Sequence, residues 1–261
     1  MEIKSSPVKL LLLDEARREE ADFLAQSLGV KCVAEESVDT LRYLVFAHQY
    51  TGLRYREIGK HNDIYVDFIG GKVGHRHRQG EGRGQTLARA IGIKANYRPR
   101  VLDVTAGLGR DGFVLASLGC KVTLLERSPW LHALLRDGMS RASQDESAAL
   151  VINRMQLHYS DALSFLAKLA KDEKPDVIYL DPMYPHREKS ALVKKEMRVI
   201  RAFVGDDTDT QTVLDMAIRS AMKRIVVKRP KTASPIDEER VNFSVAGKNT
   251  RYDVYLPVEQ N

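Results

Sequence analysis

The stretch YLDPMYPHR, residues 179–187, combines residue types that could hold an aromatic amine for chemistry. An apolar strand ends at Asp181, and the chain continues through Pro182 to Tyr184. A nucleobase amine is a poor nucleophile because its lone pair is delocalised into the ring, so its N–H bonds must be aimed at acceptors. The Asp181 carboxylate and the Pro182 carbonyl are such acceptors, and Tyr184 could stack on the base. The structural alternative is an ordinary Asp-Pro turn that closes a strand.

A second candidate site is the glycine-rich turn in VLDVTAGLGRDG. Gly107, Gly109 and Gly112 match G-x-G-x-x-G, which between a strand and a helix is typical of nucleotide-cofactor sites. Asp103 precedes them at the strand end, where its charge would oppose the pyrophosphate of a nicotinamide cofactor. S-adenosylmethionine (SAM) carries a sulfonium and an ammonium instead, and Arg110 or helix-start N–H groups could bind its carboxylate. The turn therefore favours SAM.

Acidic side chains end successive strands of the expected fold. Glu126 ends the second strand, where a carboxylate can accept both ribose hydroxyls of a nucleotide cofactor. Ser160 and Asp161 follow the third strand and could bind the adenine edge, or could merely cap the next helix. Open α/β sheets bind ligands at the carboxyl ends of their strands. Together with Asp103 and Asp181, these acids predict one ligand site at that edge.

Strand–helix alternation from residue 100 onwards would position these residues. Apolar strands are expected at RVLDV, KVTLLE, MQLHY, DVIYLD and RIVVKRP. Such alternation predicts an α/β fold with a parallel, doubly wound, Rossmann-like sheet. The end differs, because VNFSVAGKNTRYDVYLPV indicates an antiparallel hairpin that turns at residues 247–249. We expect residues 96–261 to form the domain that carries the site.

The preceding chain is expected to form a small α/β lobe, residues 1–70. VKLLLL and KCVAEE indicate strands around a helix that ends at Gly29, and RYLVFAHQYTGLRYREIG indicates a hairpin. NDIYVDFIG alternates apolar and polar residues and predicts a further strand. Residues 71–95 would then form a basic, glycine-rich connector and a short helix at TLARAIGI.

The composition, with 43% hydrophobic and 29% charged residues, is that of a globular protein. No window approaches the roughly 18 apolar residues of a membrane span, and the start of the chain does not match a signal peptide. Two isolated cysteines, Cys32 and Cys120, predict neither a disulfide framework nor a metal site. We therefore expect a cytoplasmic protein, whose net charge of +6 permits a polyanionic partner.

Basic residues in three regions could contact such a polyanion. The connector and the end of the fifth strand carry Lys72, Arg76, Arg78, Arg83, Lys228, Arg229 and Lys231. Lys194, Lys195, Arg198 and Arg201 follow the Asp-Pro turn at helical spacing. A solvated linker is the alternative for the connector, and a solvent-facing helix, considered alone, would explain the last group equally well. His75 and His77 lack a cysteine or acid at ligand spacing, so no metal is expected.

Four blocks, VLDVTAGLGRDGFVLASLG, LLERSP, YLDPMYPH and GKVGHRHRQGEGRG, together resemble the ribosomal small-subunit methyltransferase J family. Members of this family methylate the N2 amine of guanine in 16S ribosomal RNA with SAM. The resemblance covers most of the chain from about residue 60. It implies a class-I methyltransferase sheet and cofactor contacts at Arg110, Asp111, Glu126, Arg127, Ser160, Asp161 and Asp181. Met183 departs from the general Asp/Asn-Pro-Pro-Tyr/Phe turn, which is otherwise retained.

The leading prediction is therefore methyl transfer from SAM to a guanosine N2 amine in 16S ribosomal RNA, free or within the small subunit. N6-adenine methylation of DNA or RNA is an alternative, because that amine suits the same turn. Two further alternatives come from other classes of protein. One is an NAD-dependent oxidoreductase on the same sheet, and the other is a non-catalytic RNA-binding or assembly protein.

Overall fold

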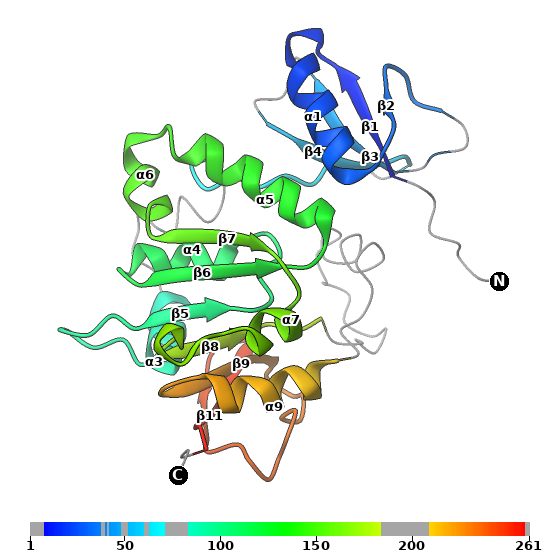
Figure 1. The fold of residues 1–261 in the computed structure, drawn as a ribbon. Helices are drawn as coiled ribbons and strands as arrows, with labels where there is room; N and C mark the ends of the chain where they lie inside the picture. Colours follow the sequence, from blue (N-terminus) through cyan, green and yellow to red (C-terminus); the bar gives the residue numbers. More distant parts are fainter. Residues whose placement is uncertain are drawn as a thin grey trace.

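The protein, described by a computed structural model, contains two β-sheets with helices packed against them (Figure 1). The structure describes residues 8–37, 40, 42–47, 52–59, 63–70, 83–183 and 209–258. Among these residues, no helix combines the length and apolar character needed to cross a membrane.

The larger sheet has seven strands in the order β10-β11-β9-β8-β5-β6-β7. Its strands are β5 (Arg100–Asp103), β6 (Lys121–Glu126), β7 (Met155–Tyr159), β8 (Val177–Leu180), β9 (Arg224–Pro230), β10 (Phe243–Ala246) and β11 (Thr250–Tyr255). Strands β5 to β9 pair in parallel, whereas β11 is antiparallel to both β9 and β10. The predicted parallel sheet with a closing hairpin is confirmed.

Helices cover both faces of this sheet (Figure 1). One hydrophobic core joins it to α3 (Arg83–Ile91), α4 (Arg110–Ser117), α5 (Pro129–Ala142) and α6 (Glu146–Ile152). A second core joins the other face to α7 (Ala162–Ala167) and α9 (Thr210–Ser220), and a short 3-10 helix, η2 (Lys171–Glu173), precedes β8. Strand side chains alternate between faces, so Val226 and Lys228 of β9 point to the α4 face, and Val227 and Arg229 to the α9 face.

The smaller sheet has the order β2-β1-β3-β4. It contains β1 (Val8–Leu13), β2 (Cys32–Val33), β3 (Arg42–Ala47) and β4 (Arg54–Glu57), with a 3-10 turn η1 (Glu15–Arg17) and helix α1 (Arg18–Leu28). Helix α1 ends as predicted at Gly29, whose φ of 65° is left-handed, a conformation that glycine adopts readily. Strands β3 and β4 form the predicted antiparallel hairpin.

The strand predicted at residues 62–70 is wrong. Of its described part, residues 63–70, only Ile64 pairs, through a single bridge to Tyr55. The alternation that predicted a strand has another cause, because Ile64, Val66 and Phe68 are all buried in the hydrophobic core that also contains residues of α4 and α5. The carbonyl of Val66 accepts a hydrogen bond from Arg141 Nη2 at 2.5 Å. The Phe68 ring stacks on Phe113 of α4, with centroids 4.7 Å apart.

Helix α5 supports this docking through Gly138, where the side chain of Val66 approaches closely. A Cβ at Gly138 would lie 2.5 Å from Val66 Cβ and would also strike Val66 Cγ1. Replacing a helix-interior glycine with alanine ordinarily stabilises a protein by about 0.5–1 kcal/mol. At this position we expect Gly138→Ala to destabilise the protein instead, by about 1–3 kcal/mol, because the added methyl overpacks the contact. Urea unfolding measures the change.

Ser140→Ala is the matched control, since Ser140 lies exposed on the same helix. Alanine has the higher helix propensity there, so the free energy of unfolding should stay equal or rise slightly. A Gly138→Ala variant that is as stable as the control would show that the contact with Val66 relaxes without cost.

Candidate active site

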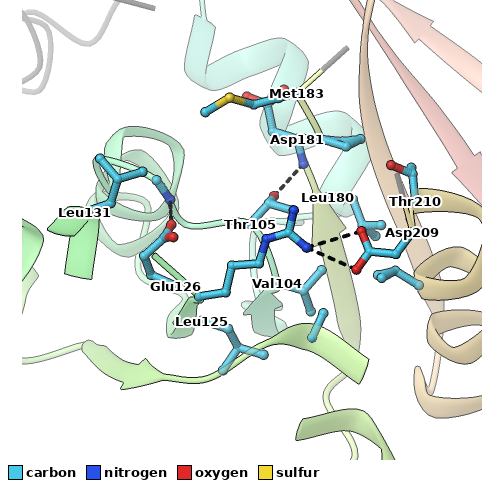
Figure 2. A pocket seen from close by; sticks show the side chains of 15 residues that line it. Val104, Thr105, Leu125, Glu126, Leu131, Leu180, Asp181, Met183, Asp209 and Thr210 are labelled. Carbon is cyan, nitrogen blue, oxygen red and sulfur yellow. Dashed lines mark hydrogen bonds and ion pairs between the residues drawn. The ribbon is translucent and has the colours of Figure 1, made fainter. Parts of the chain in front are cut away.

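The carboxyl ends of β5, β6 and β8 surround a cavity (Figure 2). Its polar lining comes from Thr105, Gly107, Glu126, Arg127, Asp181, Asp209 and Thr210, and apolar side chains such as Leu125, Leu131, Leu180 and Val213 complete it. The chain moves from β5 towards β7 on one side and towards β9 on the other. The cavity therefore lies at the topological switch point, where open α/β sheets bind ligands.

Glu126 organises the glycine turn from the end of β6. Its carboxylate accepts the N–H of Gly107 at 2.8 Å and the N–H of Ser128 at 2.7 Å, and only 6% of the residue is exposed. Carboxylate oxygens accept more than one hydrogen bond each, so Glu126 can hold the turn and bind ribose hydroxyls at the same time. Glu126 lies in the cavity wall, at the strand end where the sequence analysis placed it, and its contact with the ribose stays a prediction.

The glycines of the motif have different tasks in the structure. Gly107 has a left-handed φ of 56° and lines the cavity. Gly109, with φ of 70°, precedes α4 and packs away from the cavity, because a Cβ there would lie 2.6 Å from Leu135 Cδ1. A Cβ at Gly112 would strike Leu124 of β6. Arg110 is the first residue of α4 and is not among the residues that line the cavity. Its predicted contact with the cofactor stays a prediction.

Two of the predicted acids meet at Lys228 on the α4 face of the sheet. Lys228 Nζ lies 2.6 Å from Asp181 Oδ2 and 2.7 Å from Asp111 Oδ2. The hydroxyl of Tyr179 donates to the same Asp111 oxygen at 2.6 Å. The Asp181 N–H donates to the Thr105 hydroxyl at 2.7 Å (Figure 2), which ties the end of β8 to the turn after β5.

Asp103 lies at the base of this cluster and is only 2% exposed. Its carboxylate accepts the N–H of Thr105 at 3.0 Å. Burial raises the pKa of Asp103 to about 8, against the opposing effect of the Thr105 N–H, and the charges of Asp111 and Asp181 add to the rise. The side chain is therefore mainly neutral near pH 7, and a bound cation beside it would favour the carboxylate.

This raised pKa sets a pH dependence of stability. In the unfolded chain Asp103 ionises near its ordinary value of about 3.9, whereas in the folded chain it keeps its proton up to about pH 8. The folded state holds the extra proton, so Asp103's contribution to the free energy of unfolding falls as pH rises from about 4 to about 8. Asp103→Asn removes this titration. Urea unfolding at intervals over that range should show the variant gaining stability relative to wild type as pH rises, and a constant difference would contradict the assignment.

The sequence analysis expected Lys228 and Arg229 to lie at a cationic rim that is open to a polyanion. The structure places both elsewhere. Lys228 is held between two carboxylates. Arg229 points to the opposite face, is 8% exposed, and donates to the Ser234 carbonyl. Lys231, beyond the strand, is exposed.

The other expected RNA contacts fall largely outside the part of the chain that the structure describes. These are Lys72, Arg76 and Arg78, together with Lys194, Lys195, Arg198 and Arg201; Arg83 begins α3, and its side chain is not described. Tyr184 of the Asp-Pro turn and His75 and His77 also lie outside it. Within the described ranges, no group of three or more His, Cys, Asp or Glu residues is arranged to hold a metal ion.

Ser160 and Asp161 lie just after β7, at the expected edge, but the cavity wall is formed by their neighbour Ala162. Asp161 caps α7 by accepting the N–H of Ser164 at 2.8 Å, which lowers the pKa of Asp161. This capping role is the structural alternative that the sequence left open. Contact of either side chain with adenine therefore stays a prediction.

Arg127 reaches across the cavity to an acid that the sequence analysis missed. Its Nη1 lies 3.1 Å from Asp209 Oδ2, at the start of α9. Thr105 and Tyr179 were missed as well, although both hold predicted acids in place. Thr105 comes two residues after Asp103, at the end of the first predicted strand. A hydroxyl at that position is the one sequence signal that could have identified Thr105 as a site residue.

The donor set fits SAM and opposes a dinucleotide. Glu126 and the turned-in Gly107 suit a nucleoside, while Asp181 lies in the same cavity wall, where its carboxylate would stabilise a sulfonium. A pyrophosphate would meet the same carboxylates and be repelled. The residues that would hold the nucleoside part of the cofactor are therefore Gly107 and Glu126, with Asp181 beside the sulfonium, and the cofactor supplies an electrophilic methyl group on sulfur.

The strand order, the antiparallel β11 and this acidic site define a class-I SAM-dependent methyltransferase. A family model for SAM-dependent methyltransferases matches residues 24–257. Curated relatives named Ribosomal RNA small subunit methyltransferase J, from Aeromonas hydrophila and Thioalkalivibrio sulfidiphilus, are each 48% identical over 95% of this chain, and the matches cover 98% and 97% of those proteins. The chain belongs to the ribosomal RNA small subunit methyltransferase J family.

A solved structure agrees with this assignment. The SAM-dependent methyltransferase NGO1261 from Neisseria gonorrhoeae superimposes with a TM-score of 0.76 at 33% identity, and the match covers 97% of this chain and 98% of that one. The predicted family, fold class and SAM cofactor are confirmed. The nicotinamide-dependent alternative is overturned by the same matches.

Proposed function

We propose that this protein transfers the methyl group of SAM to the N2 amine of a guanosine in 16S ribosomal RNA. The observation that carries the proposal is that Asp181 and Pro182, directly after β8, both line the SAM cavity. The relatives' name, which specifies small-subunit ribosomal RNA, supports the substrate class. The action on ribosomal RNA would take place in the cytoplasm.

The chain's own residues act mainly by positioning. The Asp181 carboxylate, whose side chain is 38% exposed at the cavity, and the Pro182 carbonyl would accept the two N–H bonds of the amine. That orientation aims the nitrogen lone pair towards the sulfonium methyl, and Tyr184 would stack on the base. Holding the two reactants in line supplies most of the rate, so no strong general base is required.

The charge state of Asp181 favours guanine over adenine. The Lys228 ammonium lies 2.6 Å from it and stabilises negative charge on the carboxylate. A carboxylate only accepts hydrogen bonds. The Watson–Crick edge of guanine presents N1–H and N2–H as adjacent donors, whereas adenine has the acceptor N1 beside its N6 amine and offers the carboxylate no second donor.

RNA contacts outside the cavity remain proposals. Our candidates for phosphate contacts are Lys72, Arg76, Arg78 and Arg83, with the exposed Lys231 just after β9. The lobe formed by β1 to β4 would help to orient the RNA, and residues 96–261 would carry the chemistry.

The test uses small subunits and 16S ribosomal RNA from a strain that lacks the gene. Each is incubated with the purified protein and tritiated SAM, digested, and separated into nucleosides. We expect the label in N2-methylguanosine. N6-methyladenosine as the sole product would overturn the guanine assignment, and no label in either substrate would favour the non-catalytic alternative. Mass spectrometry of the untreated RNA should show one missing methyl group.

A further inference from the structure

We propose that Lys228 is a positioning residue, which fixes the Asp181 carboxylate in the orientation that receives the target amine. This inference rests on the proposed function, since it concerns how the same acid is held. It assigns the lysine to the reaction centre, in place of the RNA-contacting role that its position in the sequence indicated.

The first support is the rigidity of the backbone that carries Lys228. The lysine lies inside β9, which is paired with β8 on one side and with β11 on the other. Its neighbour across β11 is Tyr252, which is buried. A cation on such a strand has little freedom, and only 24% of the Lys228 side chain is exposed. Surface lysines that bind phosphates stand on mobile stems in water instead.

The second support is the geometry of the contacts. The ammonium lies 2.6 Å from Asp181 Oδ2 and 2.7 Å from Asp111 Oδ2. Charge-assisted hydrogen bonds of this length are strong and directional. Tyr179 donates to Asp111 from the same face, so the lysine's second partner is itself anchored. The Asp181 side chain is thus held by Lys228 while its N–H is held by Thr105.

The third support is the charge balance of the site. Burial raises the pKa of Asp103, and the nearby charges of Asp111 and Asp181 add to the rise. Without a cation, repulsion between the Asp111 and Asp181 carboxylates would push the Asp181 carboxylate outwards. Burial alone would lower the pKa of Lys228, but the charges of Asp181 and Asp111 outweigh burial and raise it. The ammonium therefore remains charged through the working pH range and offsets the repulsion.

A positioning role predicts an effect on turnover rather than on cofactor binding. Lys228 does not form part of the cavity wall, so the cofactor has no direct contact to lose. A displacement of a reacting group by about 1 Å costs about 10²-fold in rate. We therefore expect Lys228→Met to lower kcat by about 10²-fold, while the Kd for S-adenosylhomocysteine changes less than about threefold.

The control is Lys223→Met, the same substitution just before the other end of β9, where Lys223 is half exposed and pairs with Asp176. Its kcat should stay at the wild-type value. Equal losses in the two variants would overturn the proposal, because they would reflect a general effect of removing a β9 cation. Lys228→Arg keeps the charge with a different shape and should retain an intermediate kcat, which gives a second measurement if the methionine variant does not fold.

The decisive measurement is a double-mutant cycle with Asp181→Ala. If Lys228 acts through Asp181, adding Lys228→Met to Asp181→Ala should lower kcat by less than about twofold further. Multiplying losses would overturn the inference and leave Lys228 a structural residue. Full activity of Asp181→Ala alone would instead refute the proposed function, whereas an inactive Asp181→Ala beside a fully active Lys228→Met would refute the inference alone.

Discussion

Asp181→Ala is expected to lower kcat for ribosomal RNA methylation by about 10³-fold, because the amine loses an acceptor that aims its lone pair at the methyl group. The backbone at this position is held by Thr105, whose hydroxyl accepts the N–H of residue 181 whatever its side chain. The glycine turn and Glu126 are also unchanged, so S-adenosylhomocysteine should bind within a fewfold of its wild-type Kd. Single-turnover kinetics with tritiated SAM, together with isothermal titration, separate the two effects.

Asp172→Ala provides the control, since Asp172 is an exposed acid of η2. It should methylate at the wild-type rate. Undiminished methylation by Asp181→Ala would show that the turn after β8 is not the reactive element, and the search would then move to the other acids of the α4 face.

Glu126→Ala is expected to weaken binding of S-adenosylhomocysteine by about 10²-fold or more. The substitution removes the acceptor of the ribose hydroxyls and also strands the N–H groups of Gly107 and Ser128, which now donate to Glu126 at 2.8 and 2.7 Å. An unsatisfied buried donor costs about 1–3 kcal/mol, and about 1.4 kcal/mol corresponds to a tenfold change in Kd. Isothermal titration measures the loss.

Glu126→Gln separates the two parts of this effect. Glutamine keeps one carbonyl oxygen for the turn but presents an amide NH2 to the other N–H, so its Kd should fall between those of wild type and alanine. At saturating SAM, kcat of Glu126→Gln should recover towards wild type, in contrast to Asp181→Ala. An unchanged Kd in Glu126→Ala would place the ribose elsewhere in the cavity.

Much of the fold and part of the site follow from local patterns in the sequence. Alternating strands and helices specified the parallel sheet, and acids at strand ends pointed to the edge that holds the cavity. Glu126 and Asp181 were found because a strand end fixes where its last side chain lies. The prediction for Lys228 was wrong because it considered the charge of the residue and not the face of β9 on which the side chain lies. Alternate residues of a strand share a face, so Lys228 lies on the same face as the buried Val226, which is the α4 face that carries Asp111.

The remaining errors concern contacts between segments far apart in the chain. Asp209 meets Arg127 across 82 positions, and neither residue carries a local signal for the other. The alternation of residues 63–70 correctly identified buried side chains but could not say what buries them. Periodicity reports which side chains avoid water, and the identity of the partner surface is a tertiary property.

The stacking of Phe68 on Phe113 has a thermodynamic consequence. Phe68 belongs to the segment that follows β4, and its ring would also lie 3.2 Å from a Cβ at Gly109, at the end of the cofactor turn. If a ligand of the small lobe shifted this ring together with the turn, it would change the affinity of the turn for the cofactor. Linkage then requires the cofactor to change affinity for that ligand by the same factor. Binding at either half of the molecule would then change the affinity of the other half by the same factor, through the contact between Phe68 and Phe113.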